Sequence, residues 1–359
     1  MIKHLKKSLI LSFSLVLLIP SVTKADTNVT RISGIDRYET DIKIQQNCYP
    51  KASGNLAVLS SGTEFRTALY GSYMANALKI PYYVTPNNTI SKSLLEEIKN
   101  KSIKRIYIIG NYNIINKSIE NRLKLLGIKV TRFQDKYEYG EIQEISHYID
   151  SVIFETFHEG EPRGDINNGI LVNDKKFPDL LSSIPFVSSL IREQGTFFGG
   201  LDDFNTDPSD EGNLAEGWRF IIGGKNSIPS YIETFRGDKL GLNLHYWNDE
   251  SHDDSDSFYT GRIAGEDRYK TAVEIAKSYK PVLNRAIDTV IIVDGTNYPD
   301  ALASGTIAAI KGGAILLTEP GKLNEDTKAF LKENNIKNII IVGGEKSVSK
   351  KVENELKSL

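Results

Sequence analysis

The sequence predicts an α/β protein made of three tandem units with parallel sheets, and two observations lead to this prediction. The phrase "TRISGIDRYETDIKI" at residues 30–44 returns as "TGRIAGEDRYKTAVEIA" at residues 260–276. In addition, short apolar runs such as "TVIIV", "AILLT" and "NIIIVGG" alternate with helical stretches such as "PDALASGTIAAIK". Apolar runs without polar alternation are typical of strands buried on both faces. Strand–helix alternation predicts parallel sheets with right-handed crossovers.

The first 25 residues predict a secretory signal peptide. Basic residues precede an apolar run from Leu9 to Val22, and small or neutral residues lead to Ala25. This order is that of a cleavable export signal. An uncleaved membrane anchor is the alternative, although the apolar run is short for a span. We therefore expect a secreted protein, with no membrane contact after cleavage.

The remaining chain is predicted to hold three copies of one unit, at residues 26–130, 131–259 and 260–359. The first and third copies align segment by segment, so that Gly62 matches Gly295. The second copy is divergent: it opens with "TRFQDKYEYGEI" and contains two acidic insertions, at residues 199–217 and 247–257. Self-similarity at such a long period indicates a repeat architecture.

Charge and cysteine content restrict the classes of function. Without the predicted signal, the chain has 40 basic and 46 acidic residues. Its overall charge therefore does not attract nucleic acid, and we expect no nucleic-acid partner. Cys48 is the only cysteine, which excludes an intramolecular disulfide.

The motif R-[IF]-x-G-x-[DE]-R-Y-x-T occurs together with the "DGTNYPDALAS" loop and the "AILLT" and "IIIVGG" strands. This combination resembles the type 2 cell-wall-binding repeat of Gram-positive surface proteins, closely in the first and third units and loosely in the second. The resemblance implies three Toprim-like α/β modules arranged as a pseudo-threefold intramolecular trimer. It also implies non-covalent attachment to an anionic cell-wall polysaccharide, with S-layer or other surface proteins as further candidate partners.

Arginines of the repeated phrase are the candidate polymer-binding cations, because the planar guanidinium fork suits phosphate and carboxylate. They are Arg31, Arg37, Arg132, Arg262 and Arg268. For the second arginine of each phrase, the alternative is a structural role at the start of a helix, next to Asp36 or Asp267. For the first arginine of each phrase, a structural role and a binding role both remain open.

The "AILLT" strand supplies the other candidate binding residues. The resemblance associates Ile315, Leu316 and Leu317 with wall attachment, and Tyr82 and Tyr83 stand at matching positions of the first unit. Tyrosine rings could stack on sugar rings. The alternative is that all five residues belong to buried strands.

The "DGTNYPDALAS" loop is expected at the carboxyl edge of its sheet, where open α/β sheets usually bind ligands. Asp300, and Asp179 in the second unit, are expected to cap the helices that follow. The first unit has Arg66 where the third has Pro299. This arginine is either an added cation or a sign that the loop has lost its role.

Known catalytic motifs are not found in the sequence, and its histidines lack partners at metal-ligand spacing. We therefore expect neither an enzyme nor a bound metal or cofactor. The expected mechanism is multivalent: three weak sites, one in each unit, jointly bind one long polymer or neighbouring polymer strands. The alternative is a wall hydrolase or modifying enzyme whose active site lies in the acidic insertions.

Overall fold

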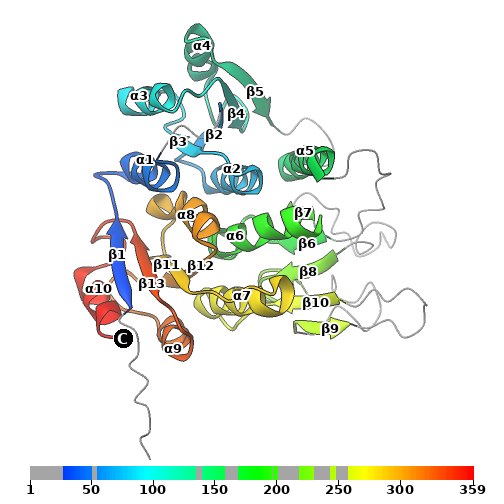
Figure 1. Ribbon diagram of the computed structural model, residues 1–359, viewed down its shortest axis with the longest axis vertical. Coiled ribbons are helices and arrows are strands. Elements are labelled where there is room, and N and C mark those ends of the chain that lie inside the picture. Colours follow the sequence, from blue (N-terminus) through cyan, green and yellow to red (C-terminus); the bar gives the residue numbers. More distant parts are fainter. Residues whose placement is uncertain are drawn as a thin grey trace, which may run out of the picture.

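The computed structural model describes residues 27–50, 55–134, 140–157, 169–195, 197–200, 218–229, 243–247 and 258–359 (Figure 1). The predicted signal peptide and most of the two acidic insertions lie outside these residues.

The described strands form three separate sheets. In the first, β2 (Leu56–Ser61), β3 (Tyr82–Thr85), β4 (Arg105–Ile109) and β5 (Lys129–Phe133) are ordered β3-β2-β4-β5. In the second, β6 (Gly169–Val172), β7 (Phe197–Gly200), β8 (Trp218–Ile222), β9 (His245–Trp247) and β10 (Phe258–Ile263) are ordered β7-β6-β8-β10-β9. The third contains β1 (Asn28–Ile32), β11 (Thr289–Asp294), β12 (Ala314–Thr318) and β13 (Asn338–Val342), ordered β1-β13-β11-β12. Only β9, among the described strands, pairs antiparallel.

One central helix from each repeat packs against the other two between the sheets. These helices are α2 (Phe65–Leu78), α6 (Phe177–Gln194) and α8 (Ser304–Lys311), the last entered through a short 3₁₀ turn at Pro299–Ala301. Their approach is close: a methyl group added at Gly305 of α8 would lie 2.6 Å from Ser72 Oγ of α2 and 3.0 Å from Ile184 Cγ2 of α6.

A second set of helices repeats the same contacts around the centre. Helix α1 (Arg37–Cys48) packs on β3 and on α8, α5 (Gly140–Phe157) on β7 and on α2, and α7 (Arg268–Leu283) on β12 and on α6. Each of these helices thus covers its own repeat's edge strand and contacts the central helix of the preceding repeat, with the first repeat following the third. This cyclic pattern confirms the predicted α/β fold of three modules in a pseudo-threefold arrangement.

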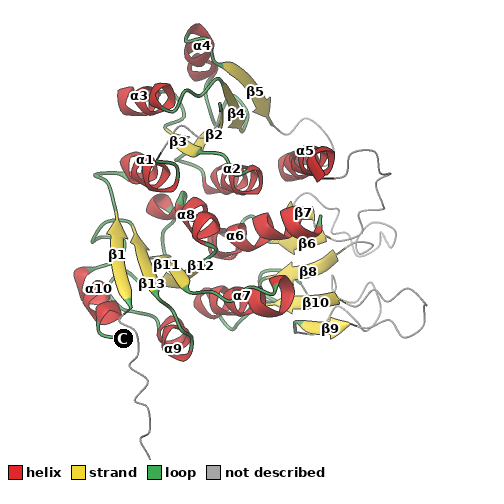
Figure 2. Ribbon diagram, viewed as in Figure 1, coloured by secondary structure: helices red, strands yellow, loops and turns green. Residues whose placement is uncertain are grey.

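The outer faces of the first and third sheets are covered by α3 (Lys92–Asn100), α4 (Lys117–Leu125), α9 (Glu325–Glu333) and α10 (Lys350–Lys357) (Figure 2). Leu94 and Ile98 of α3, with Ile119 and Leu123 of α4, are buried in one hydrophobic cluster over the first sheet. Within the described part of the chain, none of the helices is both long enough and apolar enough to span a membrane.

The opening strand of each repeat belongs to the sheet of the preceding repeat. Strand β5 opens the second repeat but pairs with β4, and β10 opens the third but pairs with β8. Strand β1 closes the ring, because it pairs in parallel with β13 near the end of the chain, with Asn28 opposite Asn338 (Figure 1). The sheets are therefore offset by one strand from the repeats seen in the sequence.

Candidate functional site

The first arginine of each repeated phrase lies where the opening strand of its repeat pairs with the sheet of the preceding repeat. We call each of these three strand pairings a joint. Arg31 donates to the carbonyls of Gly343 and Val348, both at 2.7 Å. Arg132 donates to the carbonyl of Gly110 at 2.6 Å, and Arg262 to that of Gly223. In all three cases the glycine directly follows the strand that pairs with the arginine's own strand.

The surroundings of these arginines leave little of their side-chain surface for a polymer. The side chains of Arg31 and Arg132 are 16% and 8% exposed, and Arg262 is 5% exposed. A polymer-binding role for Arg31, Arg132 and Arg262 is therefore not what the structure supports. A guanidinium group here satisfies several strand-end and loop carbonyls at once, which only a many-donor side chain can do.

Carboxylates complete two of these joints. Glu353 accepts a hydrogen bond from Arg31 Nε at 3.0 Å, and Glu120 accepts one from Arg132 Nε at 3.0 Å. Hydrogen bonds from Lys350 and Lys357, and then from Arg31, lower the pKa of Glu353 to about 2. The joint between the third and first modules is thus an ionised network at neutral pH.

The second arginine of the phrase lies at the start of a helix. Arg37 donates to the carbonyl of Gly62 at 2.5 Å, and Arg268 to that of Gly295 at 2.7 Å. Asp36 and Asp267 cap the same helices, since their carboxylates accept backbone N–H groups of the first turn. These contacts match the structural interpretation of Arg37 and Arg268. Arg268 is nevertheless an exposed residue that remains accessible to a ligand.

The candidate residues of the "AILLT" strand are inside the protein. Ile315, Leu316 and Leu317 have no exposed surface, and the same holds for Tyr82, while Tyr83 is 1% exposed. The hydroxyl of Tyr82 donates to the carbonyl of Ala68 at 2.7 Å. The prediction that these five side chains bind the polymer is therefore corrected to the alternative, buried strands.

Three aromatic side chains meet where the three central helices begin. Phe65 of the first repeat, Phe177 of the second and Tyr298 of the third occupy the same position in their repeats. Their ring centroids are 6.1 Å (Phe65–Phe177), 5.4 Å (Phe65–Tyr298) and 5.8 Å (Phe177–Tyr298) apart. All three rings are half-buried. We call these three rings the axial triad, because equivalent positions of the three repeats meet at the pseudo-threefold axis. Sequence reasoning missed the triad, although an aromatic residue at one position of all three copies was a visible signal.

The axial triad lies at the carboxyl edge of the sheets, the usual ligand position in open α/β folds. Tyr298 is held by a hydrogen bond from its hydroxyl to the carbonyl of Thr63 at 3.1 Å. The Arg268 guanidinium carbon is 6.0 Å from the Phe177 ring centroid, within reach of a cation–π contact. The arrangement offers apolar ring surface with a cation beside it.

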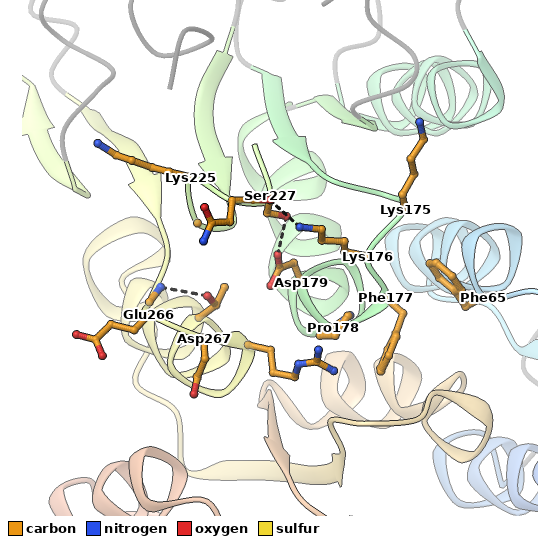
Figure 3. A pocket seen from close by; sticks show the side chains of 15 residues that line it. Phe65, Lys175, Lys176, Phe177, Pro178, Asp179, Lys225, Ser227, Glu266 and Asp267 are labelled. Carbon is orange, nitrogen blue, oxygen red and sulfur yellow. Dashed lines mark hydrogen bonds between the residues drawn. The ribbon is translucent and has the colours of Figure 1, made fainter. Parts of the chain in front are cut away.

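A cavity of about 530 Å³ adjoins the axial triad (Figure 3). It is lined by Phe65, by the loops after β6 and β8 of the second repeat, and by the start of α7 of the third. Lys176 bridges the two loops by donating to the carbonyl of Asn226 at 2.7 Å.

The expected helix caps at Asp179 and Asp300 are not formed. Asp179 lies in the first turn of α6, which has no side-chain cap, and its carboxylate accepts a hydrogen bond from Ser227 at 3.1 Å (Figure 3). Asp300 accepts one from Ser347 at 2.5 Å in the same way. Burial raises the pKa of Asp179, whereas the Ser227 hydrogen bond and the positive charges of Lys176 and Arg268 oppose the rise. Both aspartates tie the helix start to the glycine loop of their own repeat.

Arg66 is half-buried and takes part in a cluster with Asp174 and Tyr70. Its Nε lies 2.5 Å from Asp174 Oδ2, which also accepts a hydrogen bond from the Tyr70 hydroxyl at 2.5 Å. Asp174 belongs to the second repeat and stands where the other repeats have Gly62 and Gly295. This ion pair therefore occurs at a single module interface of the described structure.

Metal ligation finds no candidate in the residues that the structure describes, where no group of three or more His, Cys, Asp or Glu side chains is suited to hold an ion. The acidic stretches 201–217 and 248–257, where the alternative active site was expected, lie outside the described residues.

The comparison with protein families gives a direct match. The model described as cell wall binding domain 2 (CWB2) matches residues 31–120 and 262–353. These segments cover the first and third repeats, and together they make up half of the chain.

Two similar curated proteins are longer than this chain. It is 24% identical over 349 residues to the N-acetylmuramoyl-L-alanine amidase LytC of Bacillus subtilis (strain 168), covering 96% of this chain and 61% of the amidase. It is 24% identical over 336 residues to the amidase enhancer of the same strain, covering 93% of this chain and 41% of that protein. The chain thus spans less than two thirds of either relative.

Two solved structures share the fold over nearly the whole chain. Cwp6 from Clostridium difficile superimposes with a TM-score of 0.69 at 18% identity, covering 93% of this chain and 48% of Cwp6. Cwp8 from the same organism superimposes with a TM-score of 0.67 at 17% identity, covering 92% of this chain and 51% of Cwp8.

Proposed function

Because the chain belongs to the cell wall binding domain 2 family, we propose that it attaches non-covalently to the wall by holding an anionic polysaccharide at the axial triad. The predicted signal peptide would bring the protein to the outside of the cell. In this proposal the chain acts as a binding protein without catalysis. S-layer or other surface proteins remain candidate neighbours.

The observation that carries the proposal is the convergence of Phe65, Phe177 and Tyr298 at one point. Each ring comes from a different repeat, so the platform exists only when the three modules are assembled. Half-buried aromatic rings offer a flat apolar surface with a fixed orientation, which suits the C–H face of a sugar ring. The nearby Arg268 adds a positive charge for an anionic group.

This proposal replaces three separate sites with one composite site. The side chains expected to form a site in each repeat are largely internal, whereas the rings on the axis are half-buried at the surface. A single site of three rings draws its affinity from one continuous surface. Avidity between separate modules is then not required.

Co-sedimentation with purified walls tests the proposal. The chain is mixed with walls before and after mild acid extraction of their anionic polysaccharide. We expect binding only to the unextracted walls. Phe177→Ala, which removes the ring that contacts both the other rings and Arg268, should weaken binding at least about tenfold.

Tyr246→Ala is the matched control, because Tyr246 is 57% exposed on β9, away from the axis (Figure 1). Binding that survives both polysaccharide extraction and Phe177→Ala would refute the proposal. The enzymatic alternative rests on the amidase relative and on the acidic insertions. Zymography against the same walls decides it, since a cleared band would overturn the binding-only function.

A further inference from the structure

The loops around the axis differ in charge between the repeats. The three residues that end with the axial ring read "KKF" in the second repeat, "TEF" in the first and "TNY" in the third. The loops that follow the glycine at the end of the next strand read "GGKNS", "GNYNI" and "GGEKS" in the same order of repeats. Three lysines therefore gather in the second repeat, where the equivalent loops of the first carry one negative charge and those of the third carry none overall.

These three lysines, Lys175, Lys176 and Lys225, line the cavity beside the axial triad. Arg268 of the third repeat lines the same cavity. Lys176 uses one of its three ammonium donors on the Asn226 carbonyl. Arg268 donates from Nη1 to the carbonyl of Gly295, and Lys225 is exposed. Donors thus remain for a ligand on both sides of the cavity.

Acidic residues in the same cavity are held by other groups or lie at its margin. Asp179 accepts the Ser227 hydroxyl, and Asp267 caps α7 by accepting the Lys270 N–H. Glu266 is exposed and lies across the cavity from Lys176 (Figure 3). Lys176 points inward toward Ser227 and Asp179, whereas Lys225 extends outward at the rim of the cavity, where a ligand would enter (Figure 3).

We propose that this cavity is the anion subsite of the wall-binding surface, in which Lys176, Lys225 and Arg268 hold a phosphate group of the polymer. The inference rests on the proposed function and adds the chemistry and place of one contact. Phe177 lines the cavity and belongs to the axial triad. A sugar on the triad and its phosphate in the cavity would then be neighbours on one chain.

The residue types favour phosphate over carboxylate. Lysine acts as a point charge and suits a phosphate approached from several directions, whereas a planar carboxylate is best matched by a paired arginine fork. Here the cations come from two loops and a helix start of two different repeats. The divergent second repeat, which the family model does not match, would hold this contact.

The first measurement is wall co-sedimentation of the double variant Lys176→Gln/Lys225→Gln. Loss of two charged contacts is expected to weaken binding at least about tenfold. The control Lys92→Gln/Lys129→Gln removes the same charge from exposed positions of the first repeat and should change binding less than about twofold. Equal binding by wild type and the Lys176/Lys225 variant would overturn the subsite while leaving wall attachment intact.

The second measurement uses inorganic phosphate and is independent of the wall. Phosphate should raise the thermal unfolding midpoint of the wild type more than that of the Lys176→Gln/Lys225→Gln variant, because a ligand stabilises only the state that binds it. Acetate at equal ionic strength should give no such difference. The same midpoint rise in both proteins, or a difference as large with acetate, would overturn the phosphate assignment. Wild type that responds to phosphate but ignores walls would instead refute the proposed function.

Discussion

The joints of the ring and the loops at its axis are made from the same three repeats, but they differ in what the repeats keep. At the joints, Arg31, Arg132 and Arg262 each donate to the carbonyl of the glycine that follows a strand. At the axis, the aromatic position is kept while the residues around it change from "TEF" to "KKF" to "TNY".

This difference indicates that residues repeated in all three copies and residues that vary between the copies have different roles. A joint has the same task in every copy, which is to hold the opening strand of one repeat in the sheet of the preceding repeat. A ligand surface on the axis is built from all three modules, so the part contributed by each module can differ in charge. The most repeated residues are therefore internal connectors, and chain-specific binding is expected where the repeats disagree.

Removing a joint arginine should have the largest effect. Arg262→Ala deprives the buried carbonyls of Gly223 and Ile228 of their charged donor, and we expect a loss of about 3 kcal/mol in the free energy of unfolding. Arg268→Ala is the matched control at an exposed arginine and should cost about 1 kcal/mol or less. Urea unfolding measures both, and equal losses would break the distinction between joint and axis.

Loss of the ion pair between half-buried Arg66 and buried Asp174, at the interface of the first and second modules, should have the next largest effect. Asp174→Ala removes the acceptor of Tyr70 and the partner of Arg66, and should cost about 2 kcal/mol. Arg66→Pro/Asp174→Gly gives both positions the residues of the third repeat. Its loss should be smaller than the sum of the two single losses, because the two residues interact. Strict additivity in urea unfolding would show that the pair is not coupled.

Acid should weaken the joint that closes the ring. The pKa of Glu353 is about 2 in the folded protein against an ordinary 4.5, so ionised Glu353 stabilises the fold above about pH 4.5. This contribution is lost as the pH falls from 4.5 toward 2. Wild type should therefore lose more of its thermal midpoint over this range than Glu353→Gln. Parallel curves for the two proteins would contradict the assignment.

The smallest effect concerns the reactivity of Cys48 in α1, a helix that packs on α8 across the same joint. Burial raises the pKa of its thiol to about 12, so roughly one thiol in 10,000 is ionised at pH 8. Labelling by a disulfide reagent should be slow in the native protein and faster in Arg31→Ala, where the joint is weakened. An unchanged labelling rate would mean that α1 and α8 do not separate when the joint opens.

The sequence predicted the fold well because the repeat carried the information. Apolar strand runs and the recurring phrase led to three α/β modules, and the cyclic packing of the helices agrees with them. The offset between repeats and sheets could not be seen, because hydrophobic patterning shows that Thr30–Ile32 is a strand but not which strand it pairs with. That partner lies more than 300 residues away.

The site was predicted less well, for a physical reason. Arginine and tyrosine can bind a ligand or satisfy internal carbonyls, and the sequence alone does not distinguish the two environments. Burial decided the question for Arg31, Arg262 and Tyr82. Predicting the axial triad would have required aligning Phe65, Phe177 and Tyr298 as equivalent positions of the three copies. A threefold arrangement brings such equivalent positions together at its axis.

The pairing of β1 with β13 has a consequence for the order of folding. The strand that is synthesised first among the described residues waits for one of the last before it acquires its hydrogen-bonded neighbour. Contacts between such distant segments form slowly, because a long stretch of chain must be ordered before they are made. Except for β1, the strands of the third sheet are synthesised after those of the first and second sheets. Strand β1 cannot take its place at the edge of the third sheet until β13 has been synthesised. The third sheet is therefore completed only after β13 has been synthesised, which makes its closure by β1 a late step in folding.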